Sequence, residues 1–284
     1  MSVIQSSTTR QDDKDSPERI SELRTTPIMV FRKYLPWFVT VLNLTVFFIV
    51  WELFARSEVV SDLFLPRPSD IWAAVVEGFQ IGLFQQHLIY SLRNFALGLG
   101  LATLVGVPIG LLMGANRVVD SIFSPYVWSM ASLPRIALVP LFILILGFSD
   151  VMKVSIIFLS AIFPIIINCM AGVKTTDPSL LRAARVFGAG RRQLYTKVVF
   201  PFTLPFIISG INQGMTRGLV GLIIAEIFGG NRGLGFLIVR SADTYNSPRL
   251  FAVLIMLVIV SLSFVQGIRW VEHKVAPWRR EAAL

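Results

Sequence analysis

Three ionisable residues in the long apolar stretches of this chain, where a charge is costly, are candidates for chemistry. Arg135, Arg217 (in GMTRGLVG) and Glu226 (in AEIFGG) are these residues. A central Arg or Asp costs about 2.5–3.5 kcal/mol to place in a bilayer, so such side chains are expected to face protein or water. Arg217 can attract an anion, or it can make a structural hydrogen bond or ion pair, and both interpretations stay open.

The carboxylate of Glu226 is better suited to holding the backbone than to meeting a ligand. Arg217 and Glu226 cannot pair within one helix, because residues nine positions apart point to opposite faces. Glu226 lies near the end of its apolar run, and we expect it to anchor the following loop, which carries Gly233 and Gly235. Lys153 is its candidate partner.

Other chemically active residues are few. The single cysteine, Cys169, lies in an apolar run and cannot form an internal disulfide, so packing is its expected role. His87 and His273 have no Cys, Asp or Glu clusters at ligand spacing beside them. No nucleophile–base set and no G-x-x-x-x-G-K-[ST] phosphate loop is present. The sequence therefore predicts no catalytic residue, no metal site and no cofactor bound by this chain.

The composition is typical of an integral membrane protein. Of the 284 residues, 54% are hydrophobic and only 15% are charged, and the mean hydropathy is +0.69. A soluble domain needs more charge than this to cover its surface. The net charge of +9 is better explained by basic residues that flank membrane spans than by nucleic-acid binding.

The apolar runs predict an all-α protein with about six membrane-spanning helices. Each span needs about 20 mostly apolar residues. We expect spans near residues 36–55, 92–115, 122–147, 152–172, 203–228 and 250–268. Residues 1–35 are expected to be a disordered tail, 56–91 a loop with an interfacial helix after Leu65, and 269–284 a C-terminal tail.

Two sequence features predict how these spans are shaped and packed. Pro134 should kink or break the third span just before Arg135. Small residues in the second span suit close packing against a neighbouring helix, and these are Gly98, Gly100, Gly106 and Gly110.

The distribution of Lys and Arg predicts the orientation. With the N-terminus inside, the cytosolic segments carry 17 Lys and Arg residues and the external segments carry 5. Because positive charge gathers on the cytosolic side, both termini are expected in the cytosol. The basic segment RAARVFGAGRRQLYTKVVFPFTLP, residues 182–205, is then cytosolic as well.

This basic segment is predicted to be a helical hairpin over residues 177–201. Asp177 can cap a helix that begins at Pro178, and Gly188 and Gly190 form the elbow. A second short helix carries Leu194 and Val198 on one face, and Pro201 and Pro205 mark the return to the membrane. The first helix has an apolar stripe with helical spacing, made of Leu180, Ala183, Ala184 and Phe187.

Three roles compete for the hairpin on physical grounds. It can lie in the membrane interface with its basic residues on lipid phosphates. It can read nucleic acid, which its position between two spans makes improbable. It can also dock in a partner's groove, because two alanines make a narrow apolar ridge with charges at the rim.

The hairpin resembles the signature of ABC importer permeases, which is Glu-Ala-Ala, three residues, Gly, nine residues, Ile, one residue and Leu-Pro. The equivalent positions are Arg182, Ala183, Ala184, Gly188, Val198, Phe200 and Pro201. Arg182 reverses the charge of the family glutamate, so any ion pair that the glutamate makes with the ATPase is in question here. The resemblance implies an ATPase-coupling surface made of Arg182, Ala183, Ala184, Phe187, Gly188, Leu194, Val198 and Pro201.

The segments LPRPSDIWAA, SLPRIALVPLFILILGFSD and IIAEIFGGNRGLGFLI extend the resemblance to the nitrate, sulfonate and taurine branch of these permeases. It implies the type I importer transmembrane fold, with a permease core over 92–268 in the cytoplasmic (inner) membrane. It also implies a second permease copy, two ATPase subunits that bind ATP and Mg²⁺, and an extracytoplasmic binding protein. Arg135, Arg217 and Glu226 are then the candidate pathway residues.

The substrate and one rival class stay open at this point. A basic pathway favours a small anion such as a sulfonate or nitrate, while the same branch also includes importers of neutral or pyrimidine-type precursors. A secondary transporter, which works without ATP, commonly shows inverted repeats and paired broken helices. The sequence shows no convincing internal repeat, and only the third span has a clear proline break.

Overall fold

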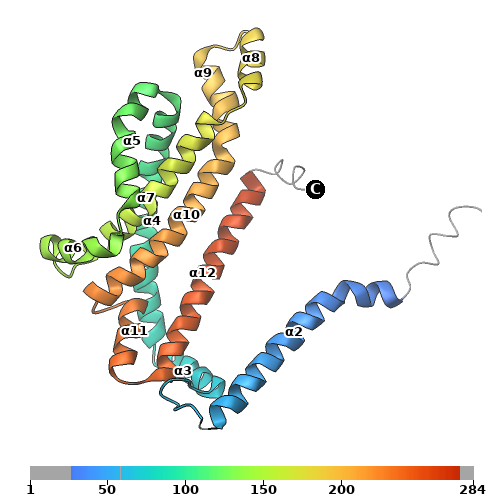
Figure 1. Ribbon diagram of the computed structural model, residues 1–284, viewed down its shortest axis with the longest axis vertical. Coiled ribbons are helices and arrows are strands. Elements are labelled where there is room, and N and C mark those ends of the chain that lie inside the picture. Colours follow the sequence, from blue (N-terminus) through green and yellow to red (C-terminus); the bar gives the residue numbers. More distant parts are fainter. Residues whose placement is uncertain (1–26, 58, 276–284) are drawn as a thin grey trace, which may run out of the picture. The chain divides into compact units, whose positions relative to one another are not determined.

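The computed structural model describes residues 27–57 and 59–275, and every regular element within them is helical (Figure 1). The chain divides into two compact units, Met1–Val59 and Val60–Leu284. The described part of the first unit is α2 (Pro27–Arg56). The prediction of a tail over 1–35 is wrong for residues 27–35, because Pro27 starts a helix that the apolar residues after it continue. Residues 1–26 lie outside the described residues.

Most side chains of the apolar part of α2 are not covered by protein. Residues Leu35–Arg56 are long and apolar enough to span a membrane, and Trp37 and Phe38 are 68% and 57% exposed. An exposed apolar helix of this length is typical of a lipid-facing span.

The second unit contains all the other helices. They are α3 (Pro68–Gln80), α4 (Leu83–Ala115), α5 (Arg117–Ser132), η1 (Arg135–Leu138), α6 (Val139–Leu146), α7 (Asp150–Lys174), α8 (Pro178–Val186), α9 (Arg191–Leu194), η2 (Tyr195–Val199), α10 (Phe200–Gly229), α11 (Leu234–Asp243) and α12 (Ser247–Val275). Among the described residues, five helices are long and apolar enough to span a membrane, or six if a bent pair counts as one span. The predicted C-terminal tail is helical up to Val275, and residues 276–284 lie outside the description.

Helix α7 is the centre of this unit, packed between α4 and α10 (Figure 1). Its residues Ile157, Ile165 and Cys169 are fully buried, which confirms a packing environment for the cysteine. Glycines on both neighbouring helices let the backbones approach closely. A Cβ atom at Gly110 of α4 would lie 2.6 Å from the Ile166 carbonyl oxygen, and one at Gly214 of α10 would lie 2.8 Å from the Ala161 carbonyl oxygen.

The third predicted span is broken at the proline, as expected. α5 ends at Ser132 and the η1–α6 segment begins at Arg135, and the two parts are bent by 92°. Pro134 has extended backbone angles (φ −70°, ψ 101°), which end α5 and start the short 3-10 helix η1. The break places Arg135 at a corner rather than on the side of a straight helix.

The two ends of the unit are tied by different contacts. At one end, Lys174 of α7 lies 2.6 Å from Asp120 of α5, and Tyr195 donates to the Ala115 carbonyl at 3.3 Å. These contacts place the α8–α9 hairpin at the same end as the α4–α5 corner. The opposite end carries α3 and α11, where Ser247 donates to the Leu63 carbonyl.

A matched pair of glycine substitutions tests the packing of α4 on α7. Gly110→Ala should destabilise the helical core by about 1–3 kcal/mol, because its new methyl group meets backbone that cannot move aside. Gly100→Ala should be neutral or slightly stabilising, because nothing lies within 4 Å of its Cβ position. The prediction that all four α4 glycines pack closely is therefore wrong for Gly100. The melting midpoint of the purified protein in detergent measures both effects, and equal midpoints for the two variants would contradict the packing.

Candidate functional site

The hairpin begins with a well-formed cap. Asp177 accepts a hydrogen bond from the Ser179 backbone N–H at 2.7 Å, and Pro178 occupies the first turn of α8. Because this hydrogen bond favours the ionised carboxylate, it holds the pKa of Asp177 below its ordinary value. The sequence pattern predicted this start correctly.

The apolar stripe on the first helix of the hairpin, which is the candidate docking surface, is largely exposed. No residue of α8 is buried, and Phe187 at the elbow is 89% exposed. Leu180 and Ala183 are exposed too, while Ala184 is half-buried. Gly188 adopts φ +78°, a left-handed conformation that favours glycine, and a Cβ there would meet no atom within 4 Å. An apolar ridge with basic neighbours therefore projects from the body, beyond the spans.

The second half of the hairpin is anchored and does not form a separate helix. Leu194 and Val199 are buried, and α9 runs through the π-helical turn η2 directly into α10. The predicted second short helix is therefore not separate from the span, and Pro201 lies in the first turn of α10, where a missing N–H is tolerated. The hairpin and the fifth span thus form one continuous segment from Arg191 to Gly229.

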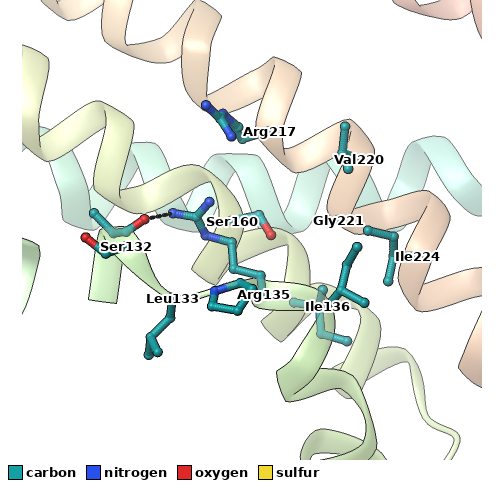
Figure 2. A pocket seen from close by; sticks show the side chains of 12 residues that line it. Ser132, Leu133, Arg135, Ile136, Ser160, Arg217, Val220, Gly221 and Ile224 are labelled. Carbon is teal, nitrogen blue, oxygen red and sulfur yellow. Dashed lines mark hydrogen bonds between the residues drawn. The ribbon is translucent and has the colours of Figure 1, made fainter. Parts of the chain in front are cut away.

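The two pathway arginines converge on one pocket. Arg135 of η1 and Arg217 of α10 line a cavity of about 370 Å³, together with Ser160 of α7 (Figure 2). The rest of the lining comes from the α5–η1 corner and from the apolar face of α10: Ala131, Ser132, Leu133, Pro134, Ile136, Ile156, Val220, Gly221 and Ile224. Two positive charges therefore face a shared cavity that no acidic side chain lines.

Neither arginine is neutralised within the described residues. Arg135 donates one hydrogen bond, from Nη2 to the Ala131 carbonyl at 3.1 Å, and its buried Nε has no partner among them. Arg217 is exposed, and it has neither a hydrogen bond nor an ion pair in residues 27–57 and 59–275. The prediction that Glu226 does not pair with Arg217 is confirmed, because the Glu226 carboxylate is occupied elsewhere.

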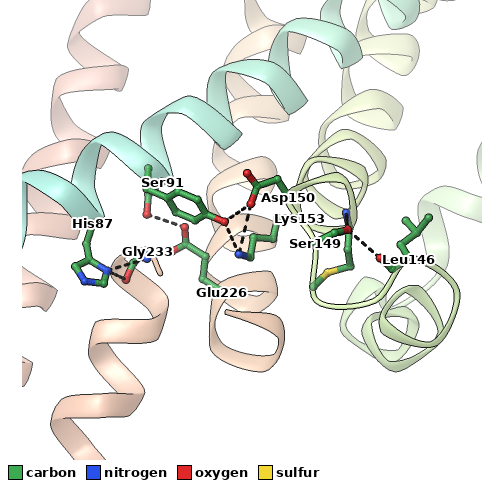
Figure 3. A network of polar contacts seen from close by, with 10 residues as sticks. His87, Ser91, Leu146, Ser149, Asp150, Lys153, Glu226 and Gly233 are labelled. Carbon is green, nitrogen blue, oxygen red and sulfur yellow. Dashed lines mark hydrogen bonds and ion pairs between the residues drawn. The ribbon is translucent and has the colours of Figure 1, made fainter. Parts of the chain in front are cut away.

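Glu226 is the hub of a polar cluster at the α3–α11 end, away from the arginine pocket (Figure 3). Its side chain is fully buried, and its carboxylate accepts from Ser91 Oγ at 2.7 Å and from the Gly235 N–H at 2.9 Å. Gly233 (φ +112°) lies so close that a Cβ there would meet the carboxylate at 2.2 Å. The predicted contact between Glu226 and the loop after it is therefore present.

Lys153 belongs to the same cluster but does not pair directly with Glu226. Lys153 Nζ donates to Tyr90 Oη at 2.6 Å and lies 3.9 Å from Asp150 Oδ1. Tyr90 in turn donates to Asp150. Lys153 is only 1% exposed, so its cation is buried against these two partners. The direct partner of Lys153 is Asp150 rather than the predicted Glu226.

His87 completes the cluster, and sequence reasoning missed its role. Its Nδ1 accepts the Gly233 N–H at 2.9 Å, and its ring stacks on Phe236 with centroids 5.8 Å apart. The two partners are 146 positions apart, so no local spacing links them. Across the described part of the chain, no three His, Cys, Asp or Glu side chains gather as a metal ion would require.

Comparison with known protein families identifies the family of this chain. Residues 106–277 match the family described as binding-protein-dependent transport system inner membrane component. The chain belongs to this family. The matched range contains the broken third span, the hairpin and both pocket arginines. The predicted membership of the importer permeases is therefore confirmed.

Curated relatives of this permease cover most of its length. The taurine transport system permease protein TauC of Escherichia coli is 30% identical over 84% of this chain and 89% of its own length. The putative aliphatic sulfonates transport permease protein SsuC of Bacillus subtilis is 32% identical over 87% of this chain and 90% of its own length. The formylaminopyrimidine transport permease protein ThiX of Halalkalibacterium halodurans is 30% identical over 82% of this chain and 92% of its own length.

The fold of the permease is similar to that of a solved importer. A chain of the MetNI methionine ABC transporter, in an inward-facing conformation, superposes with a TM-score of 0.59 and 19% identity, covering 69% of this chain and 98% of its own. The predicted fold class, an all-α importer transmembrane domain, is confirmed. The chain is thus a permease subunit of an ABC importer.

The Glu226 cluster gives a testable stability effect. Glu226→Gln should destabilise the permease by about 1–3 kcal/mol, because the amide cannot accept both the Ser91 hydroxyl and the Gly235 N–H, which leaves a buried donor without an acceptor. The double variant Glu226→Gln with Lys153→Met should lose less than the sum of the two single variants, since the buried Glu226 carboxylate and Lys153 cation attract each other. The melting midpoint of each purified variant measures the coupling, and strictly additive losses would show that the two residues act independently.

Proposed function

We propose that this chain forms the solute pathway of an ATP-driven importer for a small anionic solute of the sulfonate class. The observation that carries the proposal is the exposed ridge of α8, which ends at Phe187 and projects beyond the spans. A large aromatic side chain that is 89% exposed beside arginines suits a protein groove better than solvent. The partner of this ridge is an ATPase subunit.

The proposed complex contains two copies of the permease, two ATPase subunits that bind ATP and Mg²⁺, and an extracytoplasmic binding protein. This chain itself has no phosphate-binding loop of the G-x-x-x-x-G-K-[ST] type, which supports leaving ATP hydrolysis to the partner. The charge asymmetry of 17 to 5 Lys and Arg residues supports cytosolic termini and a cytosolic hairpin in the cytoplasmic membrane. Membrane lipid surrounds the spans, and no nucleic acid takes part.

The continuity of α9, η2 and α10 supports a direct mechanical link. When ATP binding closes the ATPase subunits, the ATPase groove that holds the ridge moves. The ridge moves with it and displaces the two helical segments to which the hairpin is attached. One attachment is the end of α7 at Lys174, and the other is the unbroken segment that carries Arg217. The switching is a rigid-body rotation between two packed arrangements, because close-packed helices do not deform gradually.

The substrate assignment rests on the relatives and on the arginine pocket. Two of the compared relatives are named for taurine and for aliphatic sulfonates, and the pocket presents two positive charges. A pyrimidine-type precursor is the second candidate, because a relative of similar identity is named for formylaminopyrimidine. Uptake of taurine, ethanesulfonate and formylaminopyrimidine by the reconstituted complex with its own binding protein distinguishes the two.

A substitution at the elbow tests the docking role. Gly188→Trp should leave the permease inserted in the membrane but reduce substrate-stimulated ATPase activity and uptake at least about tenfold, because a bulky side chain would stand on the docking face. Gly188→Asn is the matched control, since Asn tolerates the left-handed backbone at φ +78° and adds little bulk. Gly188→Trp that retains full coupled ATPase activity and uptake would show that the ridge does not dock.

A further inference from the structure

The pocket of Arg135 and Arg217 lies far from both ends of α10, a helix long and apolar enough to span a membrane. Arg217 is 17 residues from the start of α10 and 12 residues from its end, which corresponds to about 26 Å and 18 Å along the helix axis. Arg135 reaches the same cavity because the third span breaks at Pro134. Like charges that share a cavity repel each other, and a low-dielectric surrounding strengthens that repulsion. An anion bound between the two guanidinium groups would relieve this repulsion.

This chain has no described acidic residue at the right depth to supply the counter-charge. Every described Asp and Glu lies in a loop or within five residues of a helix end. Glu226, the one buried carboxylate among the described residues, already accepts hydrogen bonds from Ser91 and Gly235. A second copy of the chain would bring the same described residues at the same depths. The described residues of either copy therefore supply no counter-ion for the two arginines, and a solute in transit is a species that can reach them.

The pocket has two chemically different walls. Arg135, Arg217 and the Ser160 hydroxyl can donate hydrogen bonds, while Ile136, Val220 and Ile224 are apolar. Guanidinium groups match the geometry of oxyanions and can donate two parallel hydrogen bonds to one. A volume of about 370 Å³ is at the small end of typical ligand pockets.

We propose that this pocket is an anion-binding site on the transport pathway, in which Arg135 and Arg217 hold the charged head group of an alkyl sulfonate while Ile136, Val220 and Ile224 cover its carbon chain. The inference rests on the proposed function for the arrival of the solute, but the binding site can be tested without transport. It assigns substrate recognition to the permease itself, in addition to the delivering binding protein.

Cysteine labelling tests the charge of the pocket directly. Val220 lines the pocket and is 54% exposed, whereas the natural Cys169 is buried, so the unmodified chain serves as the labelling blank. Val220→Cys in the purified permease–ATPase complex is reacted with sulfonatoethyl methanethiosulfonate and with trimethylammonioethyl methanethiosulfonate. The labelling rate of each reagent is divided by the rate at which the same reagent reacts with a small free thiol. The anionic reagent should be favoured, and Arg135→Gln with Arg217→Gln should lower the anion-to-cation ratio at least about tenfold.

Matched controls separate charge from shape. Arg135→Lys with Arg217→Lys keeps both charges and should retain the preference for the anionic reagent. Ethanesulfonate should protect Val220→Cys from labelling, whereas ethyl methyl sulfone, a neutral molecule of similar shape, should not. A ratio that the glutamine substitutions leave unchanged, or equal protection by both compounds, would overturn the anion site.

A transport measurement keeps the two proposals distinguishable. In proteoliposomes with the companion ATPase and binding protein, the double glutamine variant should lose at least about tenfold of ATP-dependent taurine uptake, and the double lysine variant should retain more than the glutamine variant. Normal ATP-dependent uptake by the glutamine variant would overturn the site and leave the importer assignment standing. Absence of ATP-dependent uptake in the wild-type complex for every probe would overturn the proposed function, while the labelling ratio would still decide the pocket.

Discussion

A charge inside a bilayer must be compensated, and this constraint explains how the permease distributes its polar residues. The α3–α11 end meets it internally, because Glu226 accepts hydrogen bonds from Ser91 and Gly235, while Lys153 contacts Tyr90 and Asp150. The cluster ties α4, α7 and α10 to the loop before α11. The arginine pocket does not meet it internally, and the basic hairpin avoids it by lying beyond the spans. Groups without internal partners are thus the ones expected to meet other molecules.

Local patterns in the sequence were enough to predict the spanning helices, the break in the third span and the start of the hairpin. Long apolar runs identified the spans, Pro134 identified the break, and Asp177-Pro178 identified the cap. The same patterns could not show that Arg135 and Arg217 share a pocket, because the contact depends on the 92° bend after α5. They also missed His87, whose partner Gly233 is distant in sequence. They missed as well that the second hairpin helix continues through the π-helical turn η2 into α10.

The continuous segment from α9 through α10 links two features that the sequence analysis treated separately. The ridge ends at Phe187, at the elbow of the hairpin. Arg217 lies near the middle of α10, the span that continues directly from the hairpin. The glycines of α10 that meet α7, including Gly214 and Gly221, hold this span closely against the core. A rigid span in close contact is suited to transmit movement from the hairpin to the pocket.

The central claim is that the exposed ridge meets a protein rather than lipid, and site-directed photo-crosslinking tests it most directly. A photoreactive amino acid in place of Phe187, in the complex reconstituted into lipid nanodiscs, should form its main crosslink to the ATPase subunit, and ATP should alter the crosslinking yield. Crosslinks to lipid alone, in a complex that still imports its solute, would contradict the account.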